Sequence, residues 1–226
     1  MPALNEGTLV QQTIDDCYKI KKYTIQVLVV IDSGITKSTL DAAKKTKARI
    51  INIGKGKGKG TAVRKAIPFC RGDIIVQLDA DYQFLPSDLP KIVDPLLRGS
   101  DVTLGTRYQK GSHVEKNSVT TLKFLGSLFL SAVTSVFAKQ RVTDVMAGYK
   151  GFTKNALINI DPQVDHFGYE AEMVLKAAYL KYKIVNVPIS YRKRDVGNSN
   201  VHSIKHGMLV LQTILHIGKQ NLLLGW

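Results

Sequence analysis

The sequence predicts an α/β fold in which a mainly parallel sheet carries helices on both faces. Apolar runs of strand length recur at Ile25–Ile31, Arg49–Ile53, Ile74–Leu78, Asp101–Gly105 and Ile184–Ile189. Helix-like stretches separate most of them, at Gly7–Lys21, Ser38–Lys47, Gly60–Cys70 and Ser87–Leu97. Apolar strands that alternate with helices are typical of parallel sheets buried on both sides.

In chain order, each early strand follows one helix, so the first half of the chain consists of repeated helix-strand units. The later part has a different character. Ser118–Lys139 is a long apolar segment with hydroxyl groups, and Ser203–Leu224 is apolar with basic residues and histidines. We expect both to form amphipathic helices at one edge of the fold.

Length and composition indicate a single globular domain over residues 1–226. Hydrophobic residues make up 44% and charged residues 22% of the chain, close to the average of soluble proteins. Cys17 and Cys70 form no ligand pattern, which argues against a disulfide framework or a zinc site. With no signal-peptide pattern at the start, a cytoplasmic location is expected.

The net charge of +14 indicates partners that are rich in phosphate, although a basic surface could also serve solubility alone. Basic residues are not interleaved with aromatic ones, so no nucleic acid partner is expected. The longest uncharged apolar stretch, Phe124–Ala138, is shorter than the roughly 20 residues of a spanning helix. We therefore expect no transmembrane helix.

Three oxygen-bearing side chains follow the strand Ile74–Leu78: Asp79, Asp81 and Gln83. Mg²⁺ and Mn²⁺ prefer oxygen ligands, and a cation held by few protein groups keeps positions open for a diphosphate. Ligands of open α/β sheets bind beyond the carboxyl ends of strands, which is where these residues lie. A D-x-D pattern by itself is weak, since most examples are solvated turns.

The glycine-rich run Gly54–Gly60 alternates with lysines and precedes a predicted helix. Backbone amides at a helix start bind anions. The run lacks the P-loop pattern, however, because Gly60 separates Lys59 from Thr61. Phosphate contact and a flexible basic loop both remain open.

Several motifs together resemble one known family. They are PALNE at Pro2–Glu6, VVID at Val29–Asp32, KGTA at Lys59–Ala62, DADYQ at Asp79–Gln83, GTRY at Gly105–Tyr108, Asp144 with GYKGF at Gly148–Phe152, and RDVGNS at Arg194–Ser199. Their order and spacing are similar to those of family 2 glycosyltransferases with the GT-A fold, and within it to dolichyl-phosphate mannose synthase-like enzymes. The resemblance spans nearly the whole chain.

The resemblance implies roles for individual residues. The residues expected around the nucleotide are Pro2, Leu4, Glu6, Ile31, Asp32, Lys59, Asp79 and Ala80. Asp81 and Gln83 would hold Mg²⁺ or Mn²⁺, and Arg107 and Arg194 would face the donor sugar and phosphates. The residues expected to be catalytic are Asp81, Arg107, Asp144 and Arg194. Residues 1–110 would form a nucleotide-sugar half and residues 111–226 an acceptor half with interfacial helices.

The sequence departs from the family pattern at three places. Ser33 replaces the second of two adjacent acids, which makes the donor base uncertain. Asn200 stands where a lysine commonly follows the R-x-x-G-x-S motif. The family's first strand precedes PALNE, but here only Met1 does, so we expect exposed sheet edges if that strand is missing.

The expected reaction is transfer of a sugar, with inversion, from GDP-mannose, UDP-glucose or a UDP-N-acetylhexosamine to a polyprenyl phosphate. The enzyme would lie peripherally on the cytoplasmic face of an anionic membrane. A phosphate acceptor needs no general base, whereas a sugar hydroxyl would need one, with Asp144 the first candidate. The alternatives are a nucleotidyltransferase and a non-catalytic basic protein that binds nucleic acid or membrane.

Overall fold

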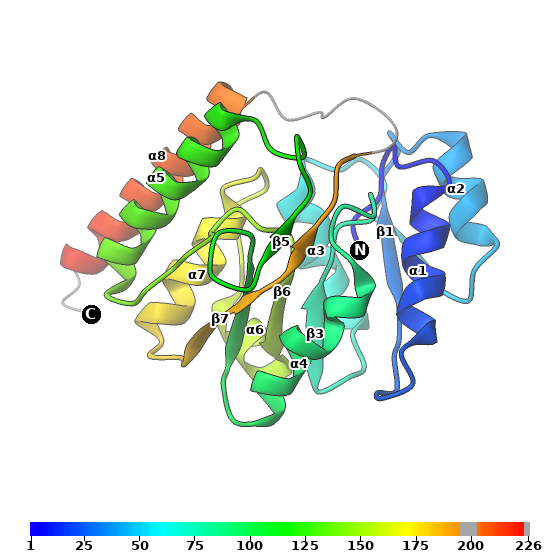
Figure 1. The fold of residues 1–226 in the computed structure, drawn as a ribbon, viewed down its shortest axis with the longest axis horizontal. Helices are drawn as coiled ribbons and strands as arrows, with labels where there is room; N and C mark the ends of the chain where they lie inside the picture. The colour runs from blue at the N-terminus through cyan, green and yellow to red at the C-terminus, as the bar shows by residue number, and fades with distance from the viewer. Residues whose placement is uncertain (195–202, 224–226) are drawn as a thin grey trace.

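The structure, a computed structural model, describes residues 1–194 and 203–223 (Figure 1). Its helices are α1 (Leu9–Lys19), α2 (Lys37–Lys44), α3 (Lys59–Ala66), α4 (Leu89–Leu97), α5 (Thr121–Ala138), α6 (Lys154–Ile160), α7 (Tyr169–Tyr179) and α8 (Ser203–Leu223). Its strands are β1 (Leu28–Ile31), β2 (Arg49–Asn52), β3 (Ile74–Gln77), β4 (Val102–Thr106), β5 (His113–Val114), β6 (Lys150–Thr153), β7 (Ile184–Pro188) and β8 (Ser190–Tyr191). The α/β fold class is confirmed, and the expected elements form with slightly different ends.

The largest sheet has the strand order β3-β6-β4-β7. Strand β4 pairs in parallel with β7, whereas β6 is antiparallel to both β3 and β4. Strands β3, β4 and β7 therefore share one direction, and β6, which the sequence did not indicate, runs against them. Within β6, Gly151 lies against α4: a Cβ atom on Gly151 would be 2.6 Å from Ile92 Cγ2. The absence of a side chain lets the helix pack directly on the sheet.

A second pairing in the fold joins β1 and β2 in parallel. On the other side of β1, Val30 N donates to Met1 O (2.8 Å) and Ala3 N donates to Val30 O (2.9 Å). Within residues 1–194 and 203–223, no backbone ladder connects β1 to β3. Val29 of β1 and Val76 of β3 nevertheless belong to one hydrophobic cluster. Side-chain packing thus joins the two sheets.

Helices cover both faces of the large sheet. Ile74 and Val76 of β3 pack into a core with α1, α2 and α4. The intervening Ile75 packs on the opposite side, into a core built by β4, β6 and helices α5 to α8. This alternation is the period of a strand that is covered on both sides. The expected two-sided arrangement is confirmed.

Helices α5 and α8 lie side by side at the end of the molecule opposite α1 and α2 (Figure 1). Large apolar side chains are exposed along both: Leu122, Leu125, Phe129 and Val136 on α5, and Ile204, Met208 and Leu215 on α8. Helix α5 is long and apolar enough to cross a membrane, and 28% of its residues are buried. Core helices of soluble proteins have the same length and composition, so the expected absence of a spanning helix stays a prediction.

Candidate active site

One cavity of about 780 Å³ lies at the carboxyl ends of β1, β3 and β4. Asp32 follows β1, Asp79 follows β3, and Arg107 follows β4, and all three line the cavity. This edge is where open α/β sheets bind their ligands. From here the cavity continues along α5 and α8, so it has a polar end and an apolar end.

Three carboxylates, those of Glu6, Asp79 and Asp81, lie at the polar end of the cavity. Burial raises the pKa of Asp79, and the charge of Asp81 adds to this rise, while Lys59 opposes it. Burial also raises the pKa of Glu6, and Asp81 and Asp79 contribute further. Carboxylates that disfavour each other's ionisation are held together at a cost in free energy, which a bound cation would relieve.

Asp81 and Gln83 fit the requirements of a divalent cation. Both side chains carry oxygen donors, and the backbone N of Gln83 donates to Asp81 Oδ1 at 3.2 Å. Over the described part of the chain, no cluster of three or more His, Cys, Asp or Glu side chains could enclose an ion. A cation here would therefore need further oxygens from a ligand, as a diphosphate supplies.

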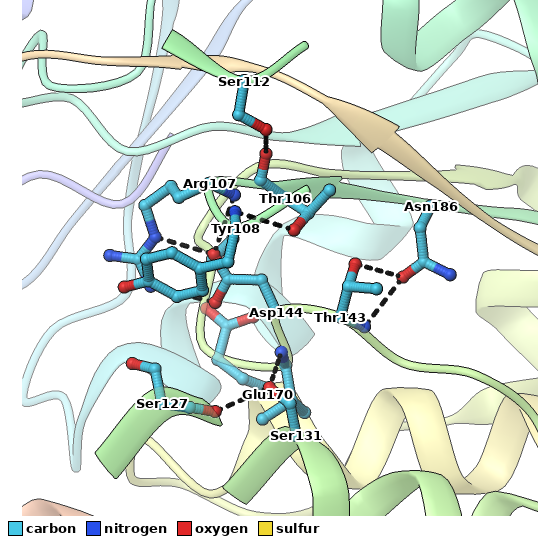
Figure 2. Close-up of polar contacts among 12 residues, drawn as sticks. Thr106, Arg107, Tyr108, Ser112, Ser127, Ser131, Thr143, Asp144, Glu170 and Asn186 are labelled. Atoms are coloured by element: carbon cyan, nitrogen blue, oxygen red, sulfur yellow. Dashed lines mark hydrogen bonds and ion pairs between the residues drawn. The ribbon is translucent and has the colours of Figure 1, made fainter. Parts of the chain in front are cut away.

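Arg107 and Asp144 form a buried bidentate pair below the cavity wall (Figure 2). Arg107 Nε donates to Asp144 Oδ2 at 2.7 Å, and Nη2 donates to Oδ1 at 2.9 Å. The backbone N of Arg107 also donates to Oδ2, at 3.1 Å. The guanidinium lies over the rings of Tyr108 and Tyr191, at 4.9 and 5.0 Å from their centroids. These contacts fix the position of the Arg107 guanidinium at the cavity wall.

Arg194 lies at the same polar end of the cavity, beside Asp81 of the acidic cluster. Its Nη2 forms an ion pair with Asp81 Oδ2 at 2.5 Å, which places a second guanidinium beside the expected cation ligand. Residues 195–199, which complete the R-x-x-G-x-S motif, and Asn200 lie outside the described residues.

Lys59 begins α3 and reaches the acidic cluster from the glycine-rich loop. Its Nζ is 2.5 Å from Asp79 Oδ1 and 3.5 Å from Glu170 Oε1. Burial alone would lower the pKa of Lys59, but these two carboxylates raise it above its ordinary value. The ammonium is therefore charged at neutral pH.

The rest of the glycine-rich loop packs over Asp32. A Cβ atom on Gly56 would be 2.5 Å from Asp32 Oδ2, and Asp32 Oδ1 accepts from Gly34 N at 2.8 Å. Gly58 and Lys59 line the cavity, while Lys55 and Lys57 are exposed. Lys59 is the lysine of this loop that lines the cavity, and its contact with phosphate stays a prediction.

The structure brings most of the expected site residues together. Those that line the cavity are Pro2, Leu4, Glu6, Asp32, Lys59, Asp79, Ala80, Asp81, Gln83, Arg107 and Arg194. Ile31 does not: its side chain belongs to the hydrophobic core, and its neighbour Val30 faces the cavity. The strand alternates its side chains between two sides, which explains the shift by one residue. Asp144 also lies off the cavity, behind Arg107.

Sequence reasoning missed other residues of the site. Glu170 lines the cavity and is almost fully buried, at 1% exposure. Tyr191 lines it beside Arg107, and Lys123 and Ser127 contribute polar groups from α5. Two glutamates in the first turn of a largely apolar helix were the available signal for Glu170, but its partners are distant in the sequence.

The apolar end of the cavity is formed by two helices. Leu122, Phe129 and Leu130 come from α5, and Ile204, Met208 and Leu211 come from α8. Arg107, Lys123 and Ser127 lie among the lining residues as well. A single cavity therefore offers charged groups for an anion and an apolar surface for a hydrocarbon chain.

Comparison with known proteins finds relatives of similar sequence and solved structures of similar fold. Glycosyltransferase AglJ of Haloferax volcanii is 28% identical over 97% of this chain and 71% of its own. Dolichol-phosphate mannosyltransferase of Pyrococcus furiosus is 27% identical over 96% of this chain and 61% of its own. Glucosyl-3-phosphoglycerate synthase of Mycobacterium tuberculosis, solved with Mn²⁺, uridine diphosphate and phosphoglyceric acid, has a TM-score of 0.74 at 20% identity. That likeness covers 96% of this chain and 76% of the other and concerns the fold.

The family model named glycosyl transferase family 2 matches residues 1–161. This match covers most of the chain and includes the residues after β1, β3 and β4 that line the cavity. On this ground the chain belongs to glycosyl transferase family 2.

Proposed function

We propose that this chain transfers a hexose, with inversion, from a nucleotide-sugar to a polyprenyl phosphate at a membrane surface. The observation that carries the proposal is the single cavity that joins the acidic cluster of Asp79 and Asp81 to the apolar groove between α5 and α8. The name of the Pyrococcus relative, dolichol-phosphate mannosyltransferase, supports the same acceptor class. GDP-mannose and UDP-hexoses are the candidate donors.

Residues 1–110 supply the donor side in this proposal, and residues 111–226 the acceptor side. Asp81 and Gln83 would hold Mg²⁺ or Mn²⁺, a cation that offsets charge on the departing diphosphate. The solved relative that contains Mn²⁺ and uridine diphosphate supports this ligand class. Arg194 and Lys59 flank the acidic cluster, where they would face the donor phosphates.

The reaction would proceed by direct displacement. An oxygen of the acceptor phosphate attacks the anomeric carbon and forms a new carbon–oxygen bond. The bond from that carbon to the diphosphate breaks, and its electron pair leaves with the nucleoside diphosphate. Arg107, expected from the sequence to face the donor sugar and phosphates, would also orient the acceptor phosphate, since its planar guanidinium suits phosphate oxygens. A phosphate monoester is already anionic near neutral pH, so no proton has to be removed.

The position of Asp144 favours a phosphate acceptor over a sugar hydroxyl. Asp144 is fully buried, and both of its oxygens accept from Arg107. A general base must reach the proton that it removes, and this carboxylate lies behind the guanidinium instead. Its role in the proposal is to hold Arg107.

An assay of the products separates the proposal from its rivals. The chain is incubated with Mn²⁺, dolichyl phosphate and either GDP-mannose or a UDP-hexose, and the released nucleotide and the lipid fraction are analysed. Release of nucleoside diphosphate with a lipid-linked sugar is expected. Release of sugar 1-phosphate, from attack on the phosphate next to the nucleoside, would identify a nucleotidyltransferase, and free sugar in the aqueous fraction without lipid-linked sugar would contradict the lipid assignment. Binding without turnover would indicate a non-catalytic protein.

A further inference from the structure

A chain of alternating charges runs from the interior of the protein to the acidic cluster. Lys150 is fully buried, and its Nζ donates to Glu170 Oε2 in a very short ion pair. Glu170 in turn faces Lys59, and Lys59 pairs with Asp79. The order is Lys150, Glu170, Lys59, Asp79, with the last three at the cavity wall.

The carboxylate of Glu170 is held rigidly. Its Oε1 accepts from Gln77 Nε2 at 2.8 Å and from the hydroxyl of Tyr169 at 2.5 Å. Lys150 is also anchored, because its Nζ donates to Val145 O at 3.0 Å and Ala147 O at 2.5 Å. A fully hydrogen-bonded charge network in the interior fixes the direction of each of its members.

Asp79, at the other end of this series of charged residues, has little room to move. A Cβ atom on Gly148 would be 2.3 Å from Asp79 Oδ2, so the carboxylate lies directly on that backbone. Lys59 holds the other oxygen. The direction of Asp79 therefore depends on where Lys59 lies, and the direction of Lys59 depends on Glu170.

We propose that Glu170 is a positioning residue for the nucleotide-sugar donor, which acts through Lys59 on Asp79. This inference rests on the donor site proposed above. The fixed Glu170 carboxylate keeps the Lys59 ammonium beside Asp79, and Lys59 in turn holds the Asp79 carboxylate at the cavity wall. Without the charge of Glu170, Lys59 has one carboxylate partner fewer. Lys59 and Asp79 are then held less firmly in the positions that bind the donor.

Helix α7 contains a matched control for this idea. Glu172 is also buried, at 2% exposure, and also pairs with a lysine, Lys176. Its oxygens accept from the backbone N atoms of Gln163 and Val164 at 2.9 and 2.8 Å. These contacts hold a loop and do not reach Asp79. Glu170→Gln and Glu172→Gln therefore make the same chemical change on the same helix, inside and outside the charge chain.

The test measures the Kd of GDP and of UDP with Mn²⁺ by calorimetry, together with the melting temperature of each variant. Glu170→Gln should raise the Kd of the nucleotide that the wild-type chain binds better by about tenfold. Glu172→Gln should leave the Kd within about twofold while it lowers the melting temperature. Equal Kd values for wild type and Glu170→Gln would overturn the inference, as would an equal rise in both variants.

A double-mutant cycle tests the route through Lys59. If Glu170 acts through Lys59, then Glu170→Gln should have no further effect on the Kd in a Lys59→Met background. Additive effects would contradict this route. Should Glu170→Gln fail to fold, the paired variant Lys150→Met with Glu170→Gln removes both inner charges. Its Kd should remain raised, and a wild-type Kd in this variant would reduce Glu170 to a structural role.

The same measurements distinguish this inference from the proposed function. A wild-type chain that binds neither nucleotide with Mn²⁺ contradicts the donor site itself, and with it both proposals. Nucleotide binding by the wild type that is unchanged in Glu170→Gln contradicts the positioning role alone.

Discussion

Arg107 donates to both carboxylate oxygens of Asp144, which is fully buried behind it. The pair links the end of β4 to the segment before β6, two regions that are distant in the sequence. A bidentate pair of this kind fixes the plane of the guanidinium as well as its position. Charge alone would not do this, so the pair can be tested by substitutions that keep the charge.

Replacing Arg107 by lysine should lower kcat/KM about 10- to 100-fold, because the ammonium retains the charge and loses the planar fork. The loss should appear with the lipid acceptor as the varied substrate. Arg141→Lys, at an exposed position, is the control and should be active. A normal rate for Arg107→Lys would show that the guanidinium geometry is not used.

Replacing Asp144 by asparagine should lower the free energy of unfolding. It leaves the buried Arg107 without its counter-charge, and loss of one partner of a buried pair typically costs about 3–5 kcal/mol. Chemical denaturation measures the free energy of unfolding. If the variant unfolds as the wild type does but transfers no sugar, Asp144 takes part in the chemistry directly, contrary to the positioning role.

Replacing Asp81 by asparagine should abolish transfer and leave the fold intact, because it removes a charged oxygen ligand of the divalent cation. Arg194, the ion-pair partner of Asp81, is only partly buried, so its exposure to solvent limits the effect on stability. Titration with Mn²⁺ in the presence of nucleotide should show weaker binding than in Asp41→Asn, an exposed control on α2. Full activity of Asp81→Asn, or wild-type activity in excess chelator, contradicts the assignment.

The fold could be predicted from the sequence where local pattern decides structure, and less so where distant contacts decide it. The strands before Asp32, Asp79 and Arg107 are apolar runs, and their polar residues follow at the carboxyl ends. Strand β6 was missed because its four residues, KGFT, include a lysine and a glycine and only one large apolar side chain. Lys150 is tolerated there because its Nζ pairs with Glu170 across the core and donates to two backbone oxygens.

The same reason explains the errors in the site. Glu170 is distant from Lys59 and Asp79 in the sequence, so no spacing rule connects these residues. Ile31 was assigned to the nucleotide by its place in a motif, but the side to which a strand residue points depends on the packing of the whole sheet. The motif residues that line the cavity lie at strand ends and in loops.

The charge chain also predicts how stability depends on pH. Although burial alone would raise the pKa of Glu170, the charges of Lys150 and Lys59 lower it below its ordinary value of 4.5. A lowered carboxyl pKa contributes stability above the ordinary value, and this contribution is lost as the pH falls through the lowered pKa. The melting temperatures of wild type and Glu170→Gln should therefore converge below pH 4.5. A difference that stays constant as the pH falls through the acidic range would contradict the ionised state of Glu170.

The last prediction concerns the membrane. The exposed apolar side chains of α5 and α8 lie beside the apolar end of the cavity, and a lipid phosphate leaves the bilayer only at a high cost in free energy. We expect these two helices to dock on an anionic membrane without crossing it. Lys139, Lys205 and Lys219 flank the apolar faces, and each basic residue near the surface contributes about 1 kcal/mol, which salt should weaken.

Co-sedimentation with anionic liposomes at low salt measures this docking. The wild-type chain should sediment, and the triple variant Leu125→Ser, Val136→Ser and Leu215→Ser should stay in the supernatant. These three side chains are exposed and do not line the cavity, so the variant should still bind nucleotide with Mn²⁺. Leu97→Ser is the control, because Leu97 is 63% exposed on α4, on the opposite side of the sheet from α5 and α8. If the triple variant sediments as the wild type does, or if the wild type stays in the supernatant, the docking surface lies elsewhere or the acceptor is not a membrane lipid. If salt has no effect, apolar insertion alone holds the protein at the surface, and the basic residues serve another purpose.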